Sequence, residues 1–539
     1  MKHQRGKSIV FIVLFAGLLL CSFVLKQSER IILAAFESKI VLINNTSPFQ
    51  ISYKGIDISI LRQSFQLKQV LILPDSLSNS DKRAQPHISI NSVVANDFEL
   101  IPLLFNRHLK IGQINFRDLD MVYRKRKNGN QTQRTSFDAT KVKKNRLKEL
   151  TIENIFVNHY NIAHLGTNLL DSTAIITGEI LLIGNVTLKR TPGKEQLALH
   201  PSLLNLSGSN LTGKFADTEL KLSNFKFDSK STHALLEGLQ MGNPDSSWEK
   251  ARRQKYNIPV NSLRIMAMEC FGIQTDSLFQ RRYFRADSIL VDRAQFTIVK
   301  NIEKPWNTSK TIPLPHQLLR SKGQHISIQK IRIEDAKTRY IEITHNDEIE
   351  IPIDQLQLSI ENLGQELRTL KGQQVKPMEI NMQGRLFNDF PINMSLTFQN
   401  PLQNNQFSFE GSTGPFYFES FNPVMVPTSN IKFESGHVRS INFNGTGNAE
   451  KTSGELVMLY ENLSATVLKQ NGQKKNTTFS WLANAAVRKE NPKNGRLKVA
   501  KMGYGRIPYK GFGNYMFKTI ESGLINSVYP FGKRKEYKR

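Results

Sequence analysis

Glycine-rich segments are the parts of this sequence that most resemble chemical sites. Gly208-Ser-Asn-Leu-Thr-Gly213-Lys214 matches the beginning of a phosphate-binding loop, which requires a Ser or Thr after the lysine and a helix behind it. Phe215 occupies that position, and residues of alternating polarity follow, so we interpret the segment as a turn between strands. The glycine pairs at 445–447, 503–505 and 511–513 lack the third glycine of a dinucleotide-binding fingerprint and are also interpreted as turns.

Histidines and cysteines offer no better candidate. His159 and His164 are the closest histidine pair, but no glutamate lies between them and no third metal ligand is evident. We interpret His159 as an ordinary sheet residue. Only two cysteines occur, Cys21 and Cys270, which excludes zinc sites built from paired cysteines, and there is no Gly-x-Ser-x-Gly elbow. The sequence predicts no catalytic residue, no cofactor and no metal, so we expect that the chain is not an enzyme.

The charge of the chain favours anionic partners. Lysine and arginine outnumber the acids 73 to 46, which gives a formal net charge of +27. Nucleic acid and anionic lipid headgroups are the two candidate partners. The basic residues are dispersed and are not interleaved with aromatic residues, so we expect no nucleic acid. The basic segments 124–146 and 533–539 are either solvated loops or points of attachment to an anionic membrane surface.

An uncharged run at Ile9–Leu25 predicts a single membrane-spanning helix of roughly 26 Å. Basic residues precede the run at Lys2, Arg5 and Lys7, which predicts that residues 1–8 stay in the cytoplasm and the remainder is exported. The alternative is a cleaved signal peptide, which ends with a small-x-small site. Lys26–Arg30 follows the run directly and contains no such site, so we favour a retained anchor.

The remainder of the chain has the period-two alternation of β-strands. The clearest candidates are Ile51–Ile60, Phe65–Leu73, Ile88–Val94, Ile351–Ile360, Met378–Leu386, Ile392–Phe398 and Phe407–Phe409. Few short helices are expected: a turn capped by Asp97, a segment at Ser246–Lys255, and a last helix at about Asn514–Val528. We therefore predict a mainly β fold, in which a transmembrane helix precedes a long curved antiparallel sheet.

A degenerate repeat is the most informative pattern. In each of four segments, apolar alternation is interrupted by a polar pair and resumes with shifted parity: Ile114–Tyr123, Leu150–His159, Ile289–Ile298 and Ile331–Tyr340. A β-bulge has this effect, because one extra residue returns the following side chains to the same face. We expect four pairs of residues to share one face of their sheet: Phe116 with Leu119, Ile152 with Ile155, Val291 with Ala294, and Ile333 with Ala336.

Read in order behind an N-terminal anchor, these repeats resemble the AsmA-like family of bacterial envelope proteins, in particular its Bacteroidetes-type members. The resemblance rests on the repeats and on Phe98–Lys110, Phe421-Asn422-Pro423, Ile431–Gly436, Ile441–Phe443, Gly454–Leu463, Ala483–Arg496 and Gly523-Leu524. It implies a periplasmic β-sheet groove anchored in the inner membrane, and a role in phospholipid movement or outer-membrane assembly. The family's motifs include no catalytic residue.

Two functions remain open. In the first, the chain handles phospholipid between the inner and outer membranes, because acyl chains need an apolar path through water. In the second, it is a periplasmic scaffold that binds envelope proteins and carries no lipid. We expect modules at 26–240 and 241–510, and a C-terminal helix and basic tail at 511–539. The candidate residues lining the groove are Phe116, Ile152, Val291, Phe296 and Ile333.

Overall fold

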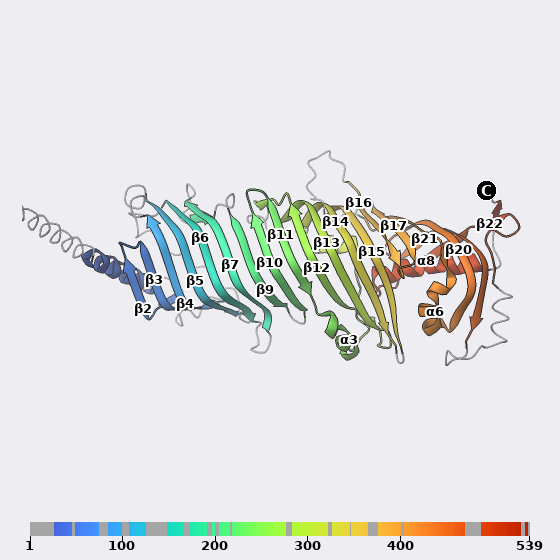
Figure 1. Cartoon of the computed structure of the whole chain (residues 1–539), viewed down its shortest axis with the longest axis horizontal. Helices are drawn as coiled ribbons and strands as arrows, with labels where there is room; N and C mark the ends of the chain where they lie inside the picture. Colours follow the sequence, from blue (N-terminus) through green and yellow to red (C-terminus); the bar gives the residue numbers. More distant parts are fainter. Residues whose placement is uncertain are drawn as a thin grey trace, which may run out of the picture. The chain divides into compact units, whose positions relative to one another are not determined.

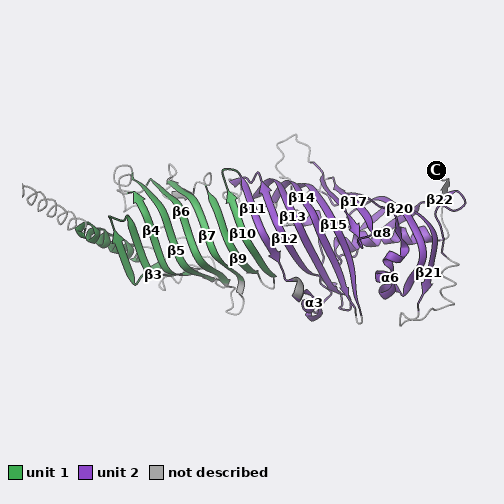
Figure 2. Ribbon diagram, viewed as in Figure 1, with its two compact units in different colours: residues 1–231 green, residues 232–539 purple. Residues whose placement is uncertain are grey.

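A computed structural model provides the structure of the chain (Figure 1). It describes residues 26–45, 49–74, 85–99, 107–124, 148–165, 172–190, 197–199, 204–215, 218–275, 277, 283–321, 326–344, 347–364, 376–399, 404–468, 487–529 and 534–536. These residues are mainly β, with few helices, as predicted. They belong to two compact units, residues 1–231 and residues 232–539 (Figure 2).

The first described element of unit 1 is a helix over residues 26–45, which the alternation pattern does not predict. Its strands are β1 (Phe49–Ser52), β2 (Gly55–Ser59), β3 (Ser64–Pro74), β4 (Gln85–Glu99), β5 (His108–Arg124), β6 (Glu149–Leu165), β7 (Ser172–Arg190), β8 (Leu197–Leu199), β9 (Asn205–Phe215) and β10 (Thr218–Asp228). Phe36 of the helix packs edge-on against Phe65 of β3, with ring centroids 5.0 Å apart. The predicted strand Ile51–Ile60 is two short strands, β1 and β2, which both pair with β3.

Unit 2 has a second run of strands and most of the helices. The strands are β11 (His233–Met241), β12 (Val260–Phe271), β13 (Phe284–Asn301), β14 (Ile326–Ile343), β15 (Glu348–Leu363), β16 (Met378–Leu386), β17 (Phe390–Phe398), β18 (Phe407–Thr413), β19 (Phe416–Tyr417), β20 (Ile431–Gly447), β21 (Lys451–Val467), β22 (Arg496–Lys498), β23 (Ala500–Gly505) and β24 (Arg534–Glu536). The helices are α3 (Pro244–Arg253), α5 (Pro315–Ser321), the 3-10 helix η3 (Phe418–Phe421), α6 (Asn422–Ser429) and α8 (Phe512–Val528).

The predicted antiparallel arrangement is wrong at two places. β5 pairs with β6 in parallel, and β13 pairs with β14 in parallel, while the other described pairings are antiparallel. A parallel pair needs a crossover connection instead of a hairpin. Residues 302–325 connect β13 to β14 in this way. The basic segment 124–146 occupies the corresponding position between β5 and β6, and nearly all of it lies outside the described residues.

Three of the four repeats have a left-handed residue at the predicted polar pair, where the parity shifts. Asp118, Arg293 and Asp335 have φ of 53°, 48° and 49° in the predicted positions. Val291 and Ala294 lie in one hydrophobic cluster, together with Ala336 and the partly buried Ile333. Since a strict strand would place residues three apart on opposite faces, the predicted shift is confirmed for the two repeats of unit 2.

The second repeat was placed five residues too early. Phe116 pairs with Val157 and Leu119 pairs with Tyr160, so the left-handed residue equivalent to Asp118 is His159, with φ of 55°. Ile152 pairs instead with Ile111. The sequence suggests the wrong register because β6 has a second interruption, at Glu153, where the pairing with β7 also skips a residue. Two similar polar pairs in one strand cannot be distinguished by alternation alone.

The predicted helices have mixed outcomes. α3 and α8 confirm two of them, whereas Asp97 caps no helix: it lies inside β4 with φ of 58°. The proposed membrane segment Ile9–Leu25 lies outside the described residues. Within the part of the chain that is described, no helix is both long enough and apolar enough to cross a membrane.

Candidate functional site

The motifs that resembled chemical sites are parts of the sheets. Residues 208–214 lie inside β9, so they are neither a phosphate-binding loop nor the predicted turn. The pairs at 445–447 and 503–505 lie in β20 and β23, and Gly513 lies in α8. His159 is a sheet residue, as predicted, with Nδ1 3.5 Å from the Asp118 carboxylate on an exposed face. Among the described residues, no three His, Cys, Asp or Glu side chains gather as a metal site.

The most extensive feature of unit 1 is a set of apolar rows that run across its strands. Directly paired residues in a sheet point to the same face. The row through Phe116 is Leu67, Val93, Phe116, Val157, Leu181, Gly208 and Phe225. The next rows are Phe65, Ala95, Ile114, Ile155, Ile183, Leu206 and Phe227, and Phe98, Ile111, Ile152 and Val186. Phe116 and Ile152 therefore lie within a face that is apolar across neighbouring strands, here called the open apolar face.

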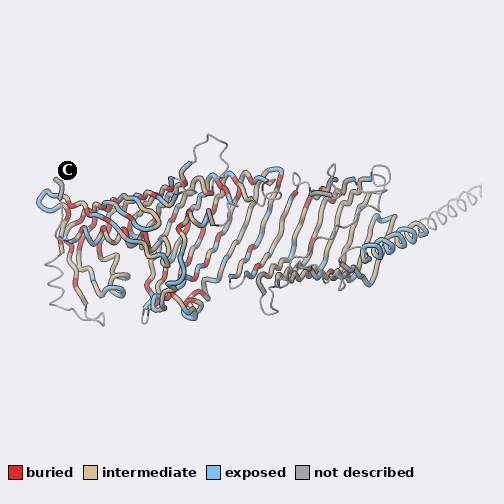
Figure 3. The backbone as a smooth tube through the Cα atoms, turned by 180° about the vertical axis from the view of Figure 1, so that it is seen from behind, coloured by how far each residue is buried: buried red, intermediate tan, exposed pale blue. Residues whose placement is uncertain are grey.

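Little in the described part of unit 1 covers this face. Phe116, Leu119 and Ile155 remain half-buried although they lie on interior strands, whereas Ile152 and Val157 on β6 are buried at 7% and 6% exposure. A phenylalanine in a covered core is usually almost fully buried. In Figure 3 the strands of unit 1 are drawn mostly in the colour of intermediate exposure, while buried residues are more frequent in unit 2. The face thus presents apolar surface to whatever lies against it.

The opposite face of unit 1 is more polar, although the row of Asn115 also contains Val94, Phe156 and Leu182. On β5, Asn115 and Arg117 alternate with the apolar residues, and Gln113 donates a hydrogen bond to Asn115 with Nε2 2.9 Å from Oδ1. Asn91 donates to Asp118 across β4 and β5, with Nδ2 3.0 Å from Oδ2. The sheet is therefore amphipathic, and its polar side is suited to water.

In unit 2 the other three predicted residues share one cluster. Val291 is buried at 4% exposure, and the half-buried Phe296 and Ile333 pack around it. All members of this cluster come from strands β11 to β16, and none from a helix: Ile265, Val291, Ala294, Ala336 and Leu356, with Leu239, Leu263, Met268, Ile289, Phe296, Ile333, Ile353 and Met382 around them. We call it the strand-only cluster.

Beyond β16 the apolar face of unit 2 is closed. Tyr515 and Met516 of α8 and Phe418 of η3 join the phenylalanines of β17 and β18 in the largest cluster, here called the closed core. The crossover 302–325 also contributes: Leu314 is fully buried, and the buried His316 ring lies 4.9 Å from that of Phe398. This part of the sheet resembles an ordinary globular core.

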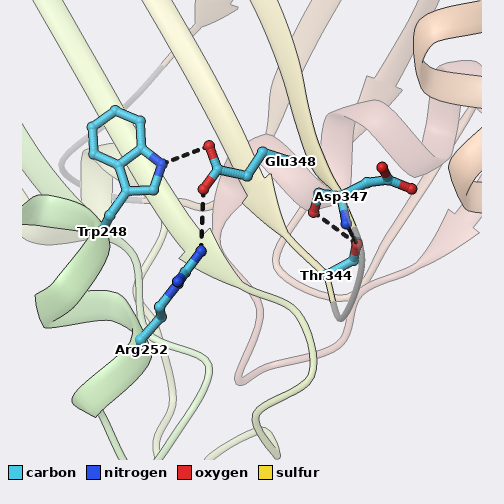
Figure 4. A network of polar contacts seen from close by, with 5 residues as sticks. All are labelled: Trp248, Arg252, Thr344, Asp347 and Glu348. Atoms are coloured by element: carbon cyan, nitrogen blue, oxygen red, sulfur yellow. Dashed lines mark hydrogen bonds and ion pairs between the residues drawn. The ribbon is translucent and has the colours of Figure 1, made fainter.

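A polar hollow of about 510 Å³ lies on the other side of unit 2, beside α3. Arg339 and Glu350 in its wall form a bidentate pair with N···O distances of 2.6 and 2.8 Å. Their hydrogen bonding raises the pKa of Arg339 and lowers that of Glu350. Next to the hollow, Glu348 accepts hydrogen bonds from Trp248 and Arg252 of α3 (Figure 4). Since these charges compensate one another, the hollow gives little indication of a charged ligand.

Comparison with protein-family models finds no family whose model matches this chain, and comparison with curated proteins finds no significant relative. Sequence reasoning identified members of the apolar faces but missed Val157, Leu181 and Phe225, which extend the row of Phe116. Alternation in β7 and β10 could have suggested these residues, but the strand register that aligns them could not be read from the sequence.

Proposed function

We propose that this chain is a membrane-anchored lipid-handling protein of the bacterial envelope, and that its open apolar face holds the acyl chains of phospholipid. The observation that carries this proposal is the set of apolar rows of unit 1, which cross up to seven paired strands and in which Phe116, Ile114 and Ile155 stay half-buried. Soluble proteins rarely leave apolar patches of more than a few hundred Å² exposed, and larger ones mark interaction sites.

The energetics favour an elongated apolar ligand. Each methylene buried from water contributes about 0.8 kcal/mol, so even a part of one acyl chain along a row gives substantial binding. A continuous row also provides neighbouring positions of similar affinity, so a chain can shift along it without returning to water. The resemblance to AsmA-like proteins supports the same proposal, as do the uncharged segment Ile9–Leu25 and the net charge of +27.

Lipid mass spectrometry of the gently purified full chain tests this function. Wild-type protein should carry co-purifying phospholipid. Phe116→Asp places a charge on the open apolar face, where an unpaired carboxylate in an apolar environment costs several kcal/mol. We expect this variant to lose most of the lipid and to keep its β-sheet circular dichroism. Phe296→Asp should do the same for lipid held at the strand-only cluster.

The matched control is Asn115→Asp. It introduces the same carboxylate one residue away, on the polar face, and keeps the acceptor oxygen for Gln113. Its lipid content should equal that of the wild type. Equal lipid loss in Phe116→Asp and Asn115→Asp would mean that the charge acts without regard to the face, and would contradict the proposal.

A non-enzymatic scaffold is the second candidate, and the closed core favours it for the end of the chain. There the interior is filled by side chains, with Phe398 fully buried and Phe407 at 2% exposure. A filled interior has no space for acyl chains, so this part would act by presenting its outer surface to envelope proteins. Wild-type protein that is free of lipid after a detergent-controlled preparation would make the scaffold the better reading of the whole chain.

The proposed location is the inner membrane, with the N-terminus in the cytoplasm and the bulk of the chain in the periplasm. The positive residues before Ile9–Leu25 support this orientation. A reporter that is active only after export, fused behind Arg539, should be active. Activity of a cytoplasm-dependent reporter at the same junction would exclude this topology.

A further inference from the structure

Two lysines share one indole ring in unit 2. Lys300, near the end of β13, has its Nζ 4.2 Å from the centre of the Trp306 ring. Lys510, which precedes α8, has its Nζ 4.8 Å from the same ring. The ring of Tyr509 lies 6.0 Å from that of Trp306. Residues from β13, the crossover 302–325 and the segment before α8 thus meet at one point.

The two positive charges at this point are poorly compensated. Neither ammonium group makes a salt bridge with a carboxylate of the described residues. Glu342 is the residue of β14 that pairs with Lys300, but it forms no salt bridge with Lys300, and its carboxylate already accepts a hydrogen bond from Tyr340, with an O···O distance of 2.6 Å. Burial lowers the pKa of Lys300; Glu342 opposes this change, and the nearby ammonium of Lys510 adds to it.

Cation–π contacts explain how the lysines are held, but they leave the positive charge in place. Such a contact is worth about 0.5–2 kcal/mol and does not neutralise an ammonium group. An anion that reaches both lysines would relieve their repulsion and gain charge-assisted hydrogen bonds. This differs from the polar hollow beside α3, where Arg339 already has Glu350 as its partner.

The position of the pair connects it to the apolar face. Alternation along β13 places Ala294, Phe296, Ile298 and Lys300 on the same side of the strand, and no left-handed residue interrupts this stretch. Ala294 and Phe296 belong to the strand-only cluster. At about 3.3 Å per residue, Lys300 lies roughly 13 Å beyond Phe296. This distance allows a phospholipid with its acyl chains on the cluster to place its phosphate at the lysines.

We infer that Lys300, Lys510 and Trp306 form a binding site for a phosphate group, which the headgroup of a phospholipid on the strand-only cluster supplies. The inference rests on the proposed function for its lipid source. The site itself needs only the phosphate, whose oxygens accept hydrogen bonds from the two ammonium groups, each of which the indole holds within 4.8 Å of its centre. Lysine is well suited to bind phosphate as a point charge.

Trp306 fluorescence tests the site without lipid. Replacing the other two tryptophans, as Trp248→Phe and Trp481→Phe, leaves Trp306 as the only indole reporter. Inorganic phosphate should change its emission saturably at constant ionic strength. The double variant Lys300→Gln/Lys510→Gln should abolish the change, whereas Lys300→Arg/Lys510→Arg should retain it. Lys310→Gln, an exposed lysine on the same crossover, is the control and should respond like the parent.

The lipid arm compares phosphatidylglycerol with diacylglycerol of the same chains, in full-length protein with the native tryptophans. One lost charge-assisted hydrogen bond corresponds to about a tenfold change in affinity or more. Wild-type protein should therefore prefer phosphatidylglycerol by about tenfold, and Lys300→Gln/Lys510→Gln should bind both lipids with similar affinity. Retained binding of diacylglycerol in the variant would show that the fold is intact.

The outcomes separate this site from the proposed function. A lysine-dependent phosphate titration, combined with wild-type protein that binds neither lipid, would support a site for free phosphate and overturn lipid handling. Lipid binding with the same headgroup preference in wild type and double variant would overturn the site and leave lipid handling standing. A thermal unfolding temperature that falls in the glutamine variant, with unchanged phosphate and headgroup responses, would show that the lysines only fasten the crossover, and would also overturn the site.

Discussion

Phe116 of unit 1 and Phe407 of unit 2 are both phenylalanines on the apolar side of an interior strand, yet their surroundings differ. Phe407 is 2% exposed, and the rings of Phe398, Phe512 and Tyr515 lie within 5.5–6.4 Å of its own. Phe116 has apolar neighbours along its row but remains half-buried. In the closed core, α8 supplies the layer that the described part of unit 1 lacks.

In unit 2, polar contacts as well as apolar packing stabilise the layer that closes the core. Thr519 of α8 meets Thr452 of β21 at a buried O···O distance of 2.7 Å. The hydroxyl of the fully buried Tyr460 donates to the carbonyl of Arg488, 2.9 Å away, and burial raises its pKa. The contact between Thr519 and Thr452 holds α8 against β21. Alternation along the strands makes one face of a sheet apolar. Whether that face is closed depends on other residues, those of the elements that pack over it.

The largest expected effect is on stability. Phe407→Ala should lower the free energy of unfolding by about 3–5 kcal/mol, because it leaves a cavity under α8. Phe116→Ala should cost only about 1 kcal/mol, since its ring is already partly in contact with solvent. Urea denaturation of the lipid-free full chain, followed by circular dichroism, measures both. Equal losses would mean that the face around Phe116 is covered after all.

Much of the fold could be predicted because one face of each strand is apolar. The bounds of β16 match the predicted strand Met378–Leu386, and α8 begins two residues before the predicted helix. The left-handed steps at Arg293 and Asp335 were also predictable, since each is a polar pair inside an alternating run. These features depend on local order along the chain, which a sequence displays directly.

The remainder depends on which strands meet. The parallel pairing of β5 with β6 places Phe116 beside Val157 and not beside Ile152, and no single strand contains that information. That α8 and η3 close the core could not be predicted either, because the apolar pattern of β18 resembles that of β5. The cluster of Lys300, Trp306 and Lys510 was missed for the same reason: its members are far apart in sequence and no motif links them.

The next largest effect on stability is expected at Gly523, because α8 approaches the sheet closely at this residue. A Cβ atom there would overlap Cγ of Met502 and lie 3.0 Å from Cβ of Leu456. Gly523→Ala should therefore lower stability by about 1–3 kcal/mol, despite the better helix propensity of alanine.

Gly513→Ala on the same helix is the matched control, since a Cβ there meets nothing within 4 Å. It should be neutral or stabilising by up to about 1 kcal/mol. A stabilising Gly523→Ala, measured by urea denaturation, would show that α8 can move away from the sheet and would weaken the contrast between the two faces.

The smallest expected effect is on the pH dependence of the free energy of unfolding. Cys270 of β12 lies two residues from Met268 of the strand-only cluster and is 4% exposed, and burial raises the pKa of its thiol from an ordinary 9.0 to about 11. Burial likewise raises the pKa of Tyr515, in the closed core, from 10.0 to about 12. In both cases the folded protein holds the proton more tightly than the unfolded chain, so stability is fully present below the unfolded pKa and is lost as pH rises toward the folded pKa. The window is pH 9–11 for Cys270 and pH 10–12 for Tyr515.

Between pH 8 and pH 10, wild-type protein should lose about 1 kcal/mol more than Cys270→Ala, because only the wild type has a thiol that ionises on unfolding. Identical pH dependence in the two proteins, or rapid reaction of Cys270 with a thiol reagent at pH 8, would mean that solvent reaches β12 at this residue and that the face of unit 2 is as open there as the face of unit 1.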